Sequence, residues 1–285
     1  MTSDPYQLFP GKHFISTVLE ALETKTAMSG ELARRYLQRA AMAGIIIGLL
    51  YVAHYGVVAA FDTVVVGGSS LRELGRLAGA LTFGWALVFI YYSKSELLTS
   101  NMMVVSIGAY YRRTSWAKAL RLLGLCFLGN FLGGLLIAAL VRFSTLTDGA
   151  TFTEMQASVD HKLEFITAGA GGWGDLFVRA VLCNFAINLA MLLIYNGLIK
   201  DDLTKSLVMI IAVFIFAFLG LEHSVANTVL FTVVGLQDGI HLGLAGANVA
   251  IALLGNFIGG GLLIGLYYAY ANDDARYLRK RSTHS

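Results

Sequence analysis

Ionisable side chains lie inside two long apolar stretches of this 285-residue chain, where charged groups are unusual. Glu222 and His223 lie in the later stretch, and Glu96 takes the equivalent place in the earlier one. An ionisable group at such a position indicates a functional site or a pathway for a polar solute. A histidine there can exchange a proton near neutral pH, or it can hold a loop by hydrogen bonds as a neutral ring. Both roles of His223 stay open at this point.

The acidic residues belong to a block that occurs twice at an offset of 126 residues. Glu96-Leu-Leu-Thr-Ser-Asn101 returns as Glu222-His-Ser-Val-Ala-Asn227, and Gly129-Asn-Phe-Leu-Gly-Gly134 returns as Gly255-Asn-Phe-Ile-Gly-Gly260. The shared offset indicates an internal duplication. We expect four matched side chains to bond the backbone groups that two helix interruptions leave without partners. These scaffold residues are Glu96, Asn101, Glu222 and Asn227.

Polar residues that occur in only one copy are better candidates for function. His223 corresponds to Leu97, and Thr99 corresponds to Val225. We predict that Thr99 and His223 form a pair at the centre of a pore. Ser224 is not expected to be a nucleophile, because adjacent helical residues diverge by about 100° and no acidic residue orients the histidine. No enzyme activity is therefore predicted.

The elements that position these residues are predicted to span a membrane. The chain is 56% hydrophobic and 14% charged, with a mean hydropathy of +0.67, which is too apolar for an ordinary soluble domain. A spanning helix needs roughly 20 apolar residues. Six segments qualify, at residues 36–60, 71–91, 115–141, 175–195, 203–220 and 246–270. Short apolar pieces at 102–110 and 226–234 complete a broken second and a broken fifth segment.

The duplication predicts an all-α fold with six transmembrane helices in an inverted repeat of three plus three. A further match supports this division, because Arg39-Ala-Ala-Met-Ala-Gly44 resembles Arg179-Ala-Val-Leu-Cys-Asn184 at an offset of 140 residues. The repeats at about 36–143 and 175–271 would run in opposite directions, with the binding site at their interface near the midplane. Residues 31–272 then form one transport domain.

The segments outside this domain are expected to be cytoplasmic. Residues 1–30 carry Phe14, Val18 and Leu22 at helical spacing, which fits an amphipathic surface helix or a plain cytoplasmic helix. Residues 273–285 form a basic tail that suits anionic lipid rather than nucleic acid. Lys and Arg concentrate on the side of both termini, so the plasma (inner) membrane would hold both termini inside. The His and Cys spacings predict no metal or cofactor.

Five motifs in this order are similar to those of the formate/nitrite transporters. The resemblance runs from about residue 36 to 270 and is carried by Glu96-Leu-Leu-Thr-Ser-Asn101, Asp160-His-Lys162, Leu182-Cys-Asn184, Gly220-Leu-Glu-His-Ser-Val-Ala-Asn227 and Gly255-Asn-Phe-Ile-Gly-Gly260. It implies an aquaporin-like, homopentameric anion channel for formate first and nitrite second, with hydrosulfide, acetate or lactate as alternatives. True aquaporins need Asn-Pro-Ala loops, and the only prolines here are Pro5 and Pro10.

The resemblance also implies which residues line the path of the anion. Each protomer would contain a pore with two hydrophobic constrictions that flank the central histidine. The implied pore or substrate residues are His223, Thr99, Leu87, Phe83, Phe216 and Asn184.

Three lysines are expected to attract anions. Lys162 and Lys205 fall where the family carries basic residues in its vestibules. Lys94 departs from the family, whose members usually have small residues there. It would pair with Glu96 or add positive charge to the pore mouth.

A small carboxylate or nitrite that enters this pore must lose water at the apolar constrictions, which favours its neutral acid. Protonation near His223, or from solvent during entry, would let the acid cross and couple transport to protons. Whether His223 donates the proton or only stabilises the anion stays open. The competing class is a non-transporting intramembrane enzyme or assembly subunit. That class needs a second catalytic-type polar group facing His223, and the sequence offers none.

Overall fold

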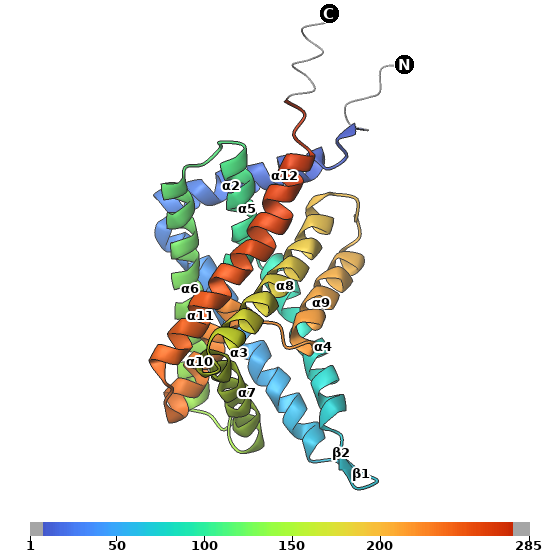
Figure 1. The fold of residues 1–285 in the computed structure, drawn as a ribbon, viewed down its shortest axis with the longest axis vertical. Helices are drawn as coiled ribbons and strands as arrows, with labels where there is room; N and C mark the ends of the chain where they lie inside the picture. The colour runs from blue at the N-terminus through green and yellow to red at the C-terminus, as the bar shows by residue number, and fades with distance from the viewer. Residues whose placement is uncertain (1–7, 276–285) are drawn as a thin grey trace, which may run out of the picture.

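The computed structural model describes residues 8–275 and is almost entirely helical (Figure 1). In chain order its elements are α2 (Lys12–Glu31), α3 (Ala33–Asp62), β1 (Val65–Val66), β2 (Ser69–Ser70), α4 (Arg72–Tyr92), α5 (Leu98–Tyr110), α6 (Trp116–Arg142), α7 (Ala150–Thr167), α8 (Ala170–Tyr195), α9 (Asp202–Phe218), α10 (Ser224–Asp238), α11 (Leu242–Asn256), the π-helix η1 (Phe257–Leu266) and α12 (Tyr267–Ala271). The two strands form a small antiparallel hairpin between α3 and α4. Most of the predicted basic tail, residues 276–285, lies outside the described residues.

Five helical segments of the described chain are long and apolar enough to cross a membrane. They are Ala33–Asp62, Arg72–Tyr92, Trp116–Arg142, Ala170–Tyr195 and Leu242–Ala271, and each contains most of one predicted span. The remaining predicted span, 203–220, is the 17-residue helix α9. That helix is about 26 Å long, slightly less than the roughly 30 Å of a bilayer core. The count of six crossings therefore stays a prediction.

The backbone takes the same course at two places 126 residues apart. Residues 93–97 separate α4 from α5, and residues 219–223 separate α9 from α10. Each segment contains a left-handed residue, Lys94 at φ 56° and Gly220 at φ 64°. Each ends on an extended residue, Leu97 or His223, directly before the next helix. The sequence repeat thus corresponds to a repeat of local structure.

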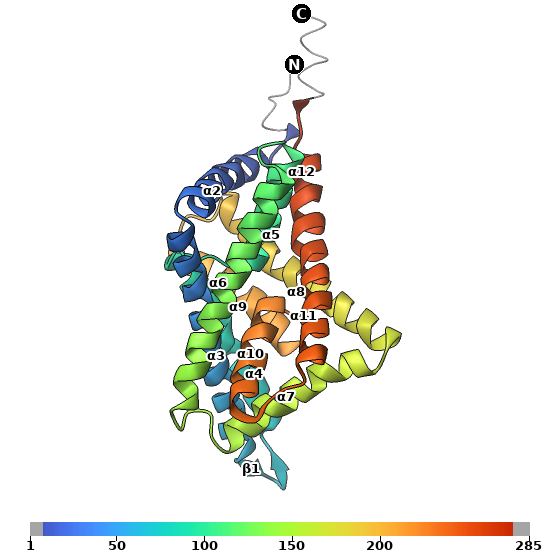
Figure 2. The same ribbon diagram turned by 90° about the vertical axis from the view of Figure 1, so that its left-hand side faces the viewer.

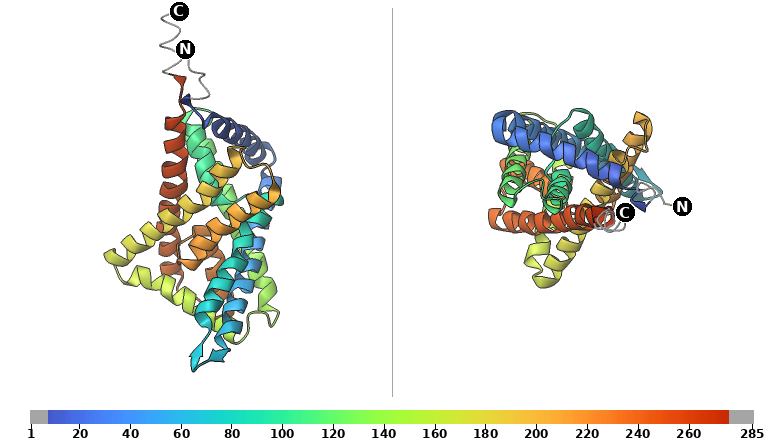
Figure 3. Two further views of the ribbon diagram at one scale, coloured as in Figure 1. Left: turned by 90° about the vertical axis from the view of Figure 1, so that its right-hand side faces the viewer. Right: turned by 90° about the horizontal axis from the view of Figure 1, so that it is seen from above.

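Each half of the chain begins with a helix that packs against the end of the bundle. Figure 2 shows α2 across one end of the molecule and α7 near the other end. In the left view of Figure 3, α7 and α8 meet in a V at the side of the bundle. The connection between the repeats is therefore helical, and α8 begins at Ala170 rather than near residue 175. The apolar residues of α2 are buried in the protein core, at Phe14, Val18 and Leu22.

Glycines bring the first and third long helices of each half close together. A Cβ on Gly133 would lie 1.8 Å from the Ala41 carbonyl oxygen, and a Cβ on Gly259 would lie 2.0 Å from the Val181 carbonyl oxygen. Only glycine permits such an approach. Because the two contacts are equivalent in the repeat, α3 packs on α6 as α8 packs on the α11–η1 segment. This packing sets the positions of the segments between them.

Candidate functional site

A buried asparagine of α6 organises the interruption between α4 and α5. The Asn130 side chain is 0% exposed, and its Oδ1 accepts a hydrogen bond of 3.1 Å from the Leu98 N–H. Its Nδ2 donates to the carbonyl oxygens of Ala40 and Glu96, both at 2.8 Å. One side chain therefore satisfies the first N–H of α5 and the Glu96 carbonyl, and it links both to the Ala40 carbonyl of α3.

Asn256 of α11 makes the same three bonds at the interruption between α9 and α10. Its Oδ1 accepts from the Ser224 N–H at 2.9 Å. Its Nδ2 donates to the carbonyl oxygens of Ala180 at 2.8 Å and Glu222 at 3.0 Å. Both helix starts are thus held by equivalent hydrogen bonds. Partial positive charge at a helix N-terminus favours an anion nearby.

The first acidic residue, Glu96, is bound by two side chains of the protein itself. Glu96 accepts from the Asn101 Nδ2 at 3.1 Å and forms an ion pair with Lys25 of α2. The predicted pairing of Glu96 with Lys94 is not present. Lys94 instead places its ammonium nitrogen 5.1 Å from the centre of the Tyr91 ring.

The second acidic residue has equivalent partners from α7. Glu222 accepts from the Asn227 Nδ2 at 2.5 Å and from the Lys162 ammonium at 2.8 Å. Asn248 Nδ2 holds the backbone carbonyl of Lys162 at 2.8 Å. The carboxylate and the ammonium are almost fully buried, so each needs the other to offset the loss of water.

The histidine and threonine that differ between the repeats contact each other. Thr99 Oγ1 lies 3.0 Å from His223 Nε2, so the contact predicted from the sequence is confirmed, while its functional role stays a prediction. His223 Nδ1 accepts from the Ala226 N–H at 3.1 Å and caps α10. A neutral ring therefore carries its proton on Nε2 and donates it to Thr99. The Thr99 carbonyl is held by the amides of Asn184 and Asn188, at 3.1 and 3.2 Å.

A small apolar chamber adjoins the histidine. Its volume is about 20 Å³. Among the described residues that form its wall, His223 is the only polar one. The wall is formed by Ile47, Phe83, Ala86, Leu87, Ile90, Leu97, Ile187, Val213, Phe216, His223 and Ala226. The Phe216 ring stacks on His223 with centroids 5.7 Å apart, and the Phe83 and Phe216 rings meet edge to face with the same centroid separation. The three residues predicted at constrictions, Phe83, Leu87 and Phe216, thus share this chamber.

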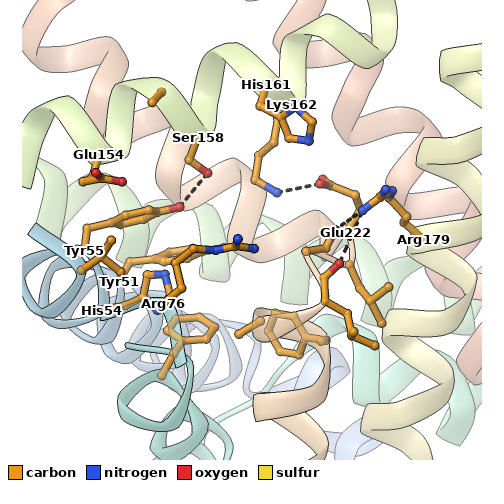
Figure 4. A pocket seen from close by; sticks show the side chains of 18 of the residues that line it. Tyr51, His54, Tyr55, Arg76, Glu154, Ser158, His161, Lys162, Arg179 and Glu222 are labelled. Carbon is orange, nitrogen blue, oxygen red and sulfur yellow. Dashed lines mark hydrogen bonds and ion pairs between the residues drawn. The ribbon is translucent and has the colours of Figure 1, made fainter. Parts of the chain in front are cut away.

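On one side the chamber adjoins a larger cavity beside α7, here called the α7 vestibule (Figure 4). Its volume is about 330 Å³, and it shares Phe83 and Phe216 with the chamber. Four cations line it, and each has a carboxylate oxygen within 3.0 Å. The pairs are Arg72–Glu154, Arg76–Glu73, Lys162–Glu222 and Arg179–Asp175.

The opposite side leads to a second cavity of about 250 Å³ beside α2, the α2 vestibule. It shares Leu87, Ile90 and Leu97 with the chamber. Its charged lining residues are Lys25, Arg39, Lys94 and Glu96. The shared residues place the chamber between the two vestibules, and this row of three cavities with an apolar centre is here called the path.

Two of the predicted path residues lie elsewhere. Lys205 pairs with Asp202 at 3.0 Å and is not among the lining residues of either vestibule. Asn184 lies behind Thr99 rather than in the chamber wall, and its second bond goes to the Asn256 carbonyl at 2.7 Å. Their roles in transport stay predictions. Among residues 8–275, no three His, Cys, Asp or Glu side chains gather as metal ligands.

The sequence reasoning missed several residues of this path. Ile90 is the repeat counterpart of Phe216, and Ile187 is the counterpart of Ile47, so adding or subtracting the two offsets would have identified them. Asn130 and Asn256 were also identifiable, since both stand in the duplicated Gly-Asn-Phe block. Lys25 had no comparable signal, because α2 lies outside the repeated segments.

Two vestibules that carry cations and meet at a small apolar chamber define a class, that of membrane channels and transporters. A sequence model of the family described as formate/nitrite transporter matches residues 12–270, and the chain belongs to this family. It is therefore a multi-pass membrane protein of a transport family rather than of an enzyme family.

Individual relatives agree with this assignment. The nitrite transporter NirC of Salmonella typhimurium is 30% identical, with 81% of each chain covered. The formate channel FocA of Haemophilus influenzae is 28% identical over 69% of this chain and 74% of its own. A solved FNT family ion channel, 25% identical, superposes with a TM-score of 0.76 over 91% of this chain and 99% of its own. A pentameric formate channel with formate bound, 23% identical, gives 0.67 over 87% and 98%.

Proposed function

We propose that the protein conducts small monovalent weak-acid anions across the membrane, with formate first and nitrite second. The observation that carries this proposal is the apolar chamber beside His223, between two vestibules that carry cations. The names of the relatives FocA and NirC support the two substrates. Hydrosulfide, acetate and lactate are the alternatives within the same architecture.

The proposal includes six crossings, with interruptions in the second and fifth. The matching geometry of the α4–α5 and α9–α10 segments supports it, since both use equivalent asparagine bonds. Both termini would face the cytoplasm of a plasma (inner) membrane, because Lys and Arg are concentrated on that side. The α2 vestibule would then be the cytoplasmic one. A homopentamer is proposed from the pentameric formate channel that shares the fold.

In the proposed mechanism, the cost of losing water decides whether the charged anion or its neutral acid crosses the chamber. The positive charges of a vestibule raise the local concentration of anions. The chamber, at about 20 Å³, has room for about one water molecule, so a hydrated anion must shed its shell to enter. The charged form is penalised in these apolar surroundings, and the neutral acid crosses.

The hydrogen bonds of His223 limit how it can take part. Its Nδ1 is occupied by the cap of α10, and its Nε2–H points at Thr99. A neutral imidazole is too weak an acid to protonate formate, so proton donation requires that Nδ1 first take up a proton from solvent and release the cap of α10. A hydrogen bond from the neutral Nε2–H to an anion requires only that the Thr99 hydroxyl be displaced. A proton supplied by solvent during entry needs no such rearrangement, and substitutions at the two positions distinguish the routes.

The test is anion flux into proteoliposomes for formate, nitrite, hydrosulfide, acetate and lactate, each at two pH values. His223→Ala is expected to lower formate flux at least about tenfold, which corresponds to about 1.4 kcal/mol. His223→Asn retains a side chain that can cap α10, and it should pass formate without the pH dependence that the ring provides. Thr99→Val places at this position the valine that the other repeat has at Val225. It also leaves the Nε2–H of His223 without its hydrogen-bond acceptor.

Two results would contradict the proposal. Flux and pH dependence that survive His223→Ala would remove the histidine from the mechanism. Wild-type protein that is folded yet passes none of the five anions at either pH would favour a non-transporting membrane protein.

A further inference from the structure

The two vestibules differ in how their arginines are neutralised. Arg39 in the α2 vestibule and Arg179 in the α7 vestibule are counterparts at the offset of 140. Arg179 Nε donates to Asp175 Oδ1 at 2.9 Å, and its Nη1 donates to the Gly220 carbonyl at 3.1 Å. The counterpart of Asp175 is Arg35, so the first repeat has a second cation where the other has an acid.

The same contrast holds at the left-handed residue of each interruption. The second repeat has Gly220 at φ 64°, and glycine takes this conformation without steric cost. The first repeat has Lys94 at φ 56°, which is unfavourable for a residue with a Cβ. The turn itself therefore requires no side chain. The lysine places an exposed ammonium group in the wall of the α2 vestibule.

The carboxylate in this vestibule has other partners. Glu96 is bound by Lys25 and by the amide of Asn101. Among the described residues, neither Arg39 nor Lys94 has a carboxylate oxygen within 4.0 Å. Arg39 Nη1 instead donates to the Met28 sulfur at 3.2 Å, and Lys94 lies over Tyr91. Two cations at one end of the path are thus without a neutralising acid.

We propose that Arg39 and Lys94 form a docking site for the transported carboxylate in the α2 vestibule. The guanidinium group can receive a carboxylate through two parallel hydrogen bonds, and the ammonium supplies a second positive charge. The α7 vestibule lacks this site because its four cations are paired with carboxylates. The protein therefore takes up anions with higher apparent affinity from the α2 face. This inference rests on the proposed function and adds a direction to it.

The first test is formate influx measured from each face of the protein. Liposomes are prepared with the chain in a known orientation, which protease accessibility of a terminal tag establishes. Lys94→Gly installs the counterpart residue, and Lys94→Asn removes the charge with a residue that tolerates positive φ. Either variant is expected to raise the half-saturating formate concentration about threefold from the α2 face. From the α7 face it should stay unchanged.

Matched controls separate this site from general charge effects. Arg76→Gln removes a cation of the α7 vestibule that is paired with Glu73, and it should not alter half-saturation from the α2 face. Lys200→Gln removes an exposed cation that is not among the lining residues of either vestibule. The effect of Lys94→Gly should shrink at high salt because exposed charges are screened. Equal changes from both faces would overturn the proposal.

A binding measurement separates this inference from the proposed function. Lys94 is acylated with a water-soluble acetylating reagent, and its modification rate is measured by peptide mass spectrometry with and without formate at constant ionic strength. Formate is expected to slow acylation of Lys94 and leave that of Lys200 unchanged. Protection without flux would contradict the proposed function and retain the site. The docking site would be contradicted, and the proposed function retained, if formate flux is present but two results are missing. These are protection of Lys94 from acylation and a change in half-saturation from the α2 face alone in Lys94→Gly.

The stability of the variants excludes damage as the cause. Lys94→Gly should unfold at the wild-type temperature or above it, because glycine fits the left-handed turn. A lower unfolding temperature, together with reduced flux from both faces, would overturn the assignment.

Discussion

The interruption before α5 and the interruption before α10 share one hydrogen-bonding frame but present different side chains to the chamber. Asn130 and Asn256 make equivalent bonds to the backbone. Within that frame, Leu97 occupies the position that His223 occupies in the other half. The comparison shows that duplicated residues hold the backbone of both interruptions, whereas the proposed function assigns the chemistry to residues that differ between the copies. Three experiments test this division.

The largest expected effect is on stability, and it should be equal in both halves. Asn256→Ala leaves the Ser224 N–H and the Glu222 carbonyl without this partner and removes a further bond to the Ala180 carbonyl of α8, at about 4 kcal/mol in total. Asn130→Ala should cost a similar amount. Denaturant unfolding in detergent measures both variants, with Asn196→Ala at the half-buried end of α8 as the control. A large loss in only one of the two would break the equivalence of the frames.

A smaller and unequal effect is expected at the two ion pairs. Lys162→Met leaves Glu222 buried without its partner and should cost about 3 kcal/mol. Lys25→Met should cost about 1 kcal/mol, because the Lys25–Glu96 pair is more exposed to water. Thermal unfolding of both variants provides the comparison. Lys162→Met combined with Glu222→Gln should recover part of the stability, and no recovery would contradict the ion pair as the cause.

The smallest effect concerns the chamber wall, where Phe216 and Ile90 are counterparts. Phe216→Ile gives both sides of the chamber the same residue and enlarges it. Formate flux should rise, and lactate should gain relative to formate, each by less than about tenfold. Competitive uptake in liposomes measures the ratio. An unchanged ratio would place the selective step outside the chamber.

Much of the fold could be predicted from the sequence, because the hydropathy pattern marks the spans and the internal repeat marks the two halves. The bounds of α3, α4 and α6 lie within three residues of their predicted spans. The sequence predicted no helix in the connection between the repeats, because α7 owes its place to packing contacts with α3, α8 and α11 rather than to hydropathy. Helix α9 is shorter than a typical spanning helix, which hydropathy over a fixed window does not resolve.

The site was predictable where it depends on the repeat and not where it depends on tertiary contacts. The Thr99–His223 contact followed from comparison of the two copies. The partner of Glu96 was missed, because Lys25 is 71 residues away on α2, whereas Lys94 is near in sequence. Lys205 has a near partner instead, since Asp202 lies three residues before it, and its role in attracting anions stays a prediction.

The size of the chamber also concerns the energy supply of the cell. A cavity with room for about one water molecule contains no continuous file of hydrogen-bonded waters, and protons move rapidly only along such a file. The apolar wall formed by Phe83, Leu87 and Phe216 would therefore act as an insulator between the two vestibules. In the proposed mechanism protons would then cross only when they are bound to an acid, so an open path need not collapse the electrical potential across the membrane.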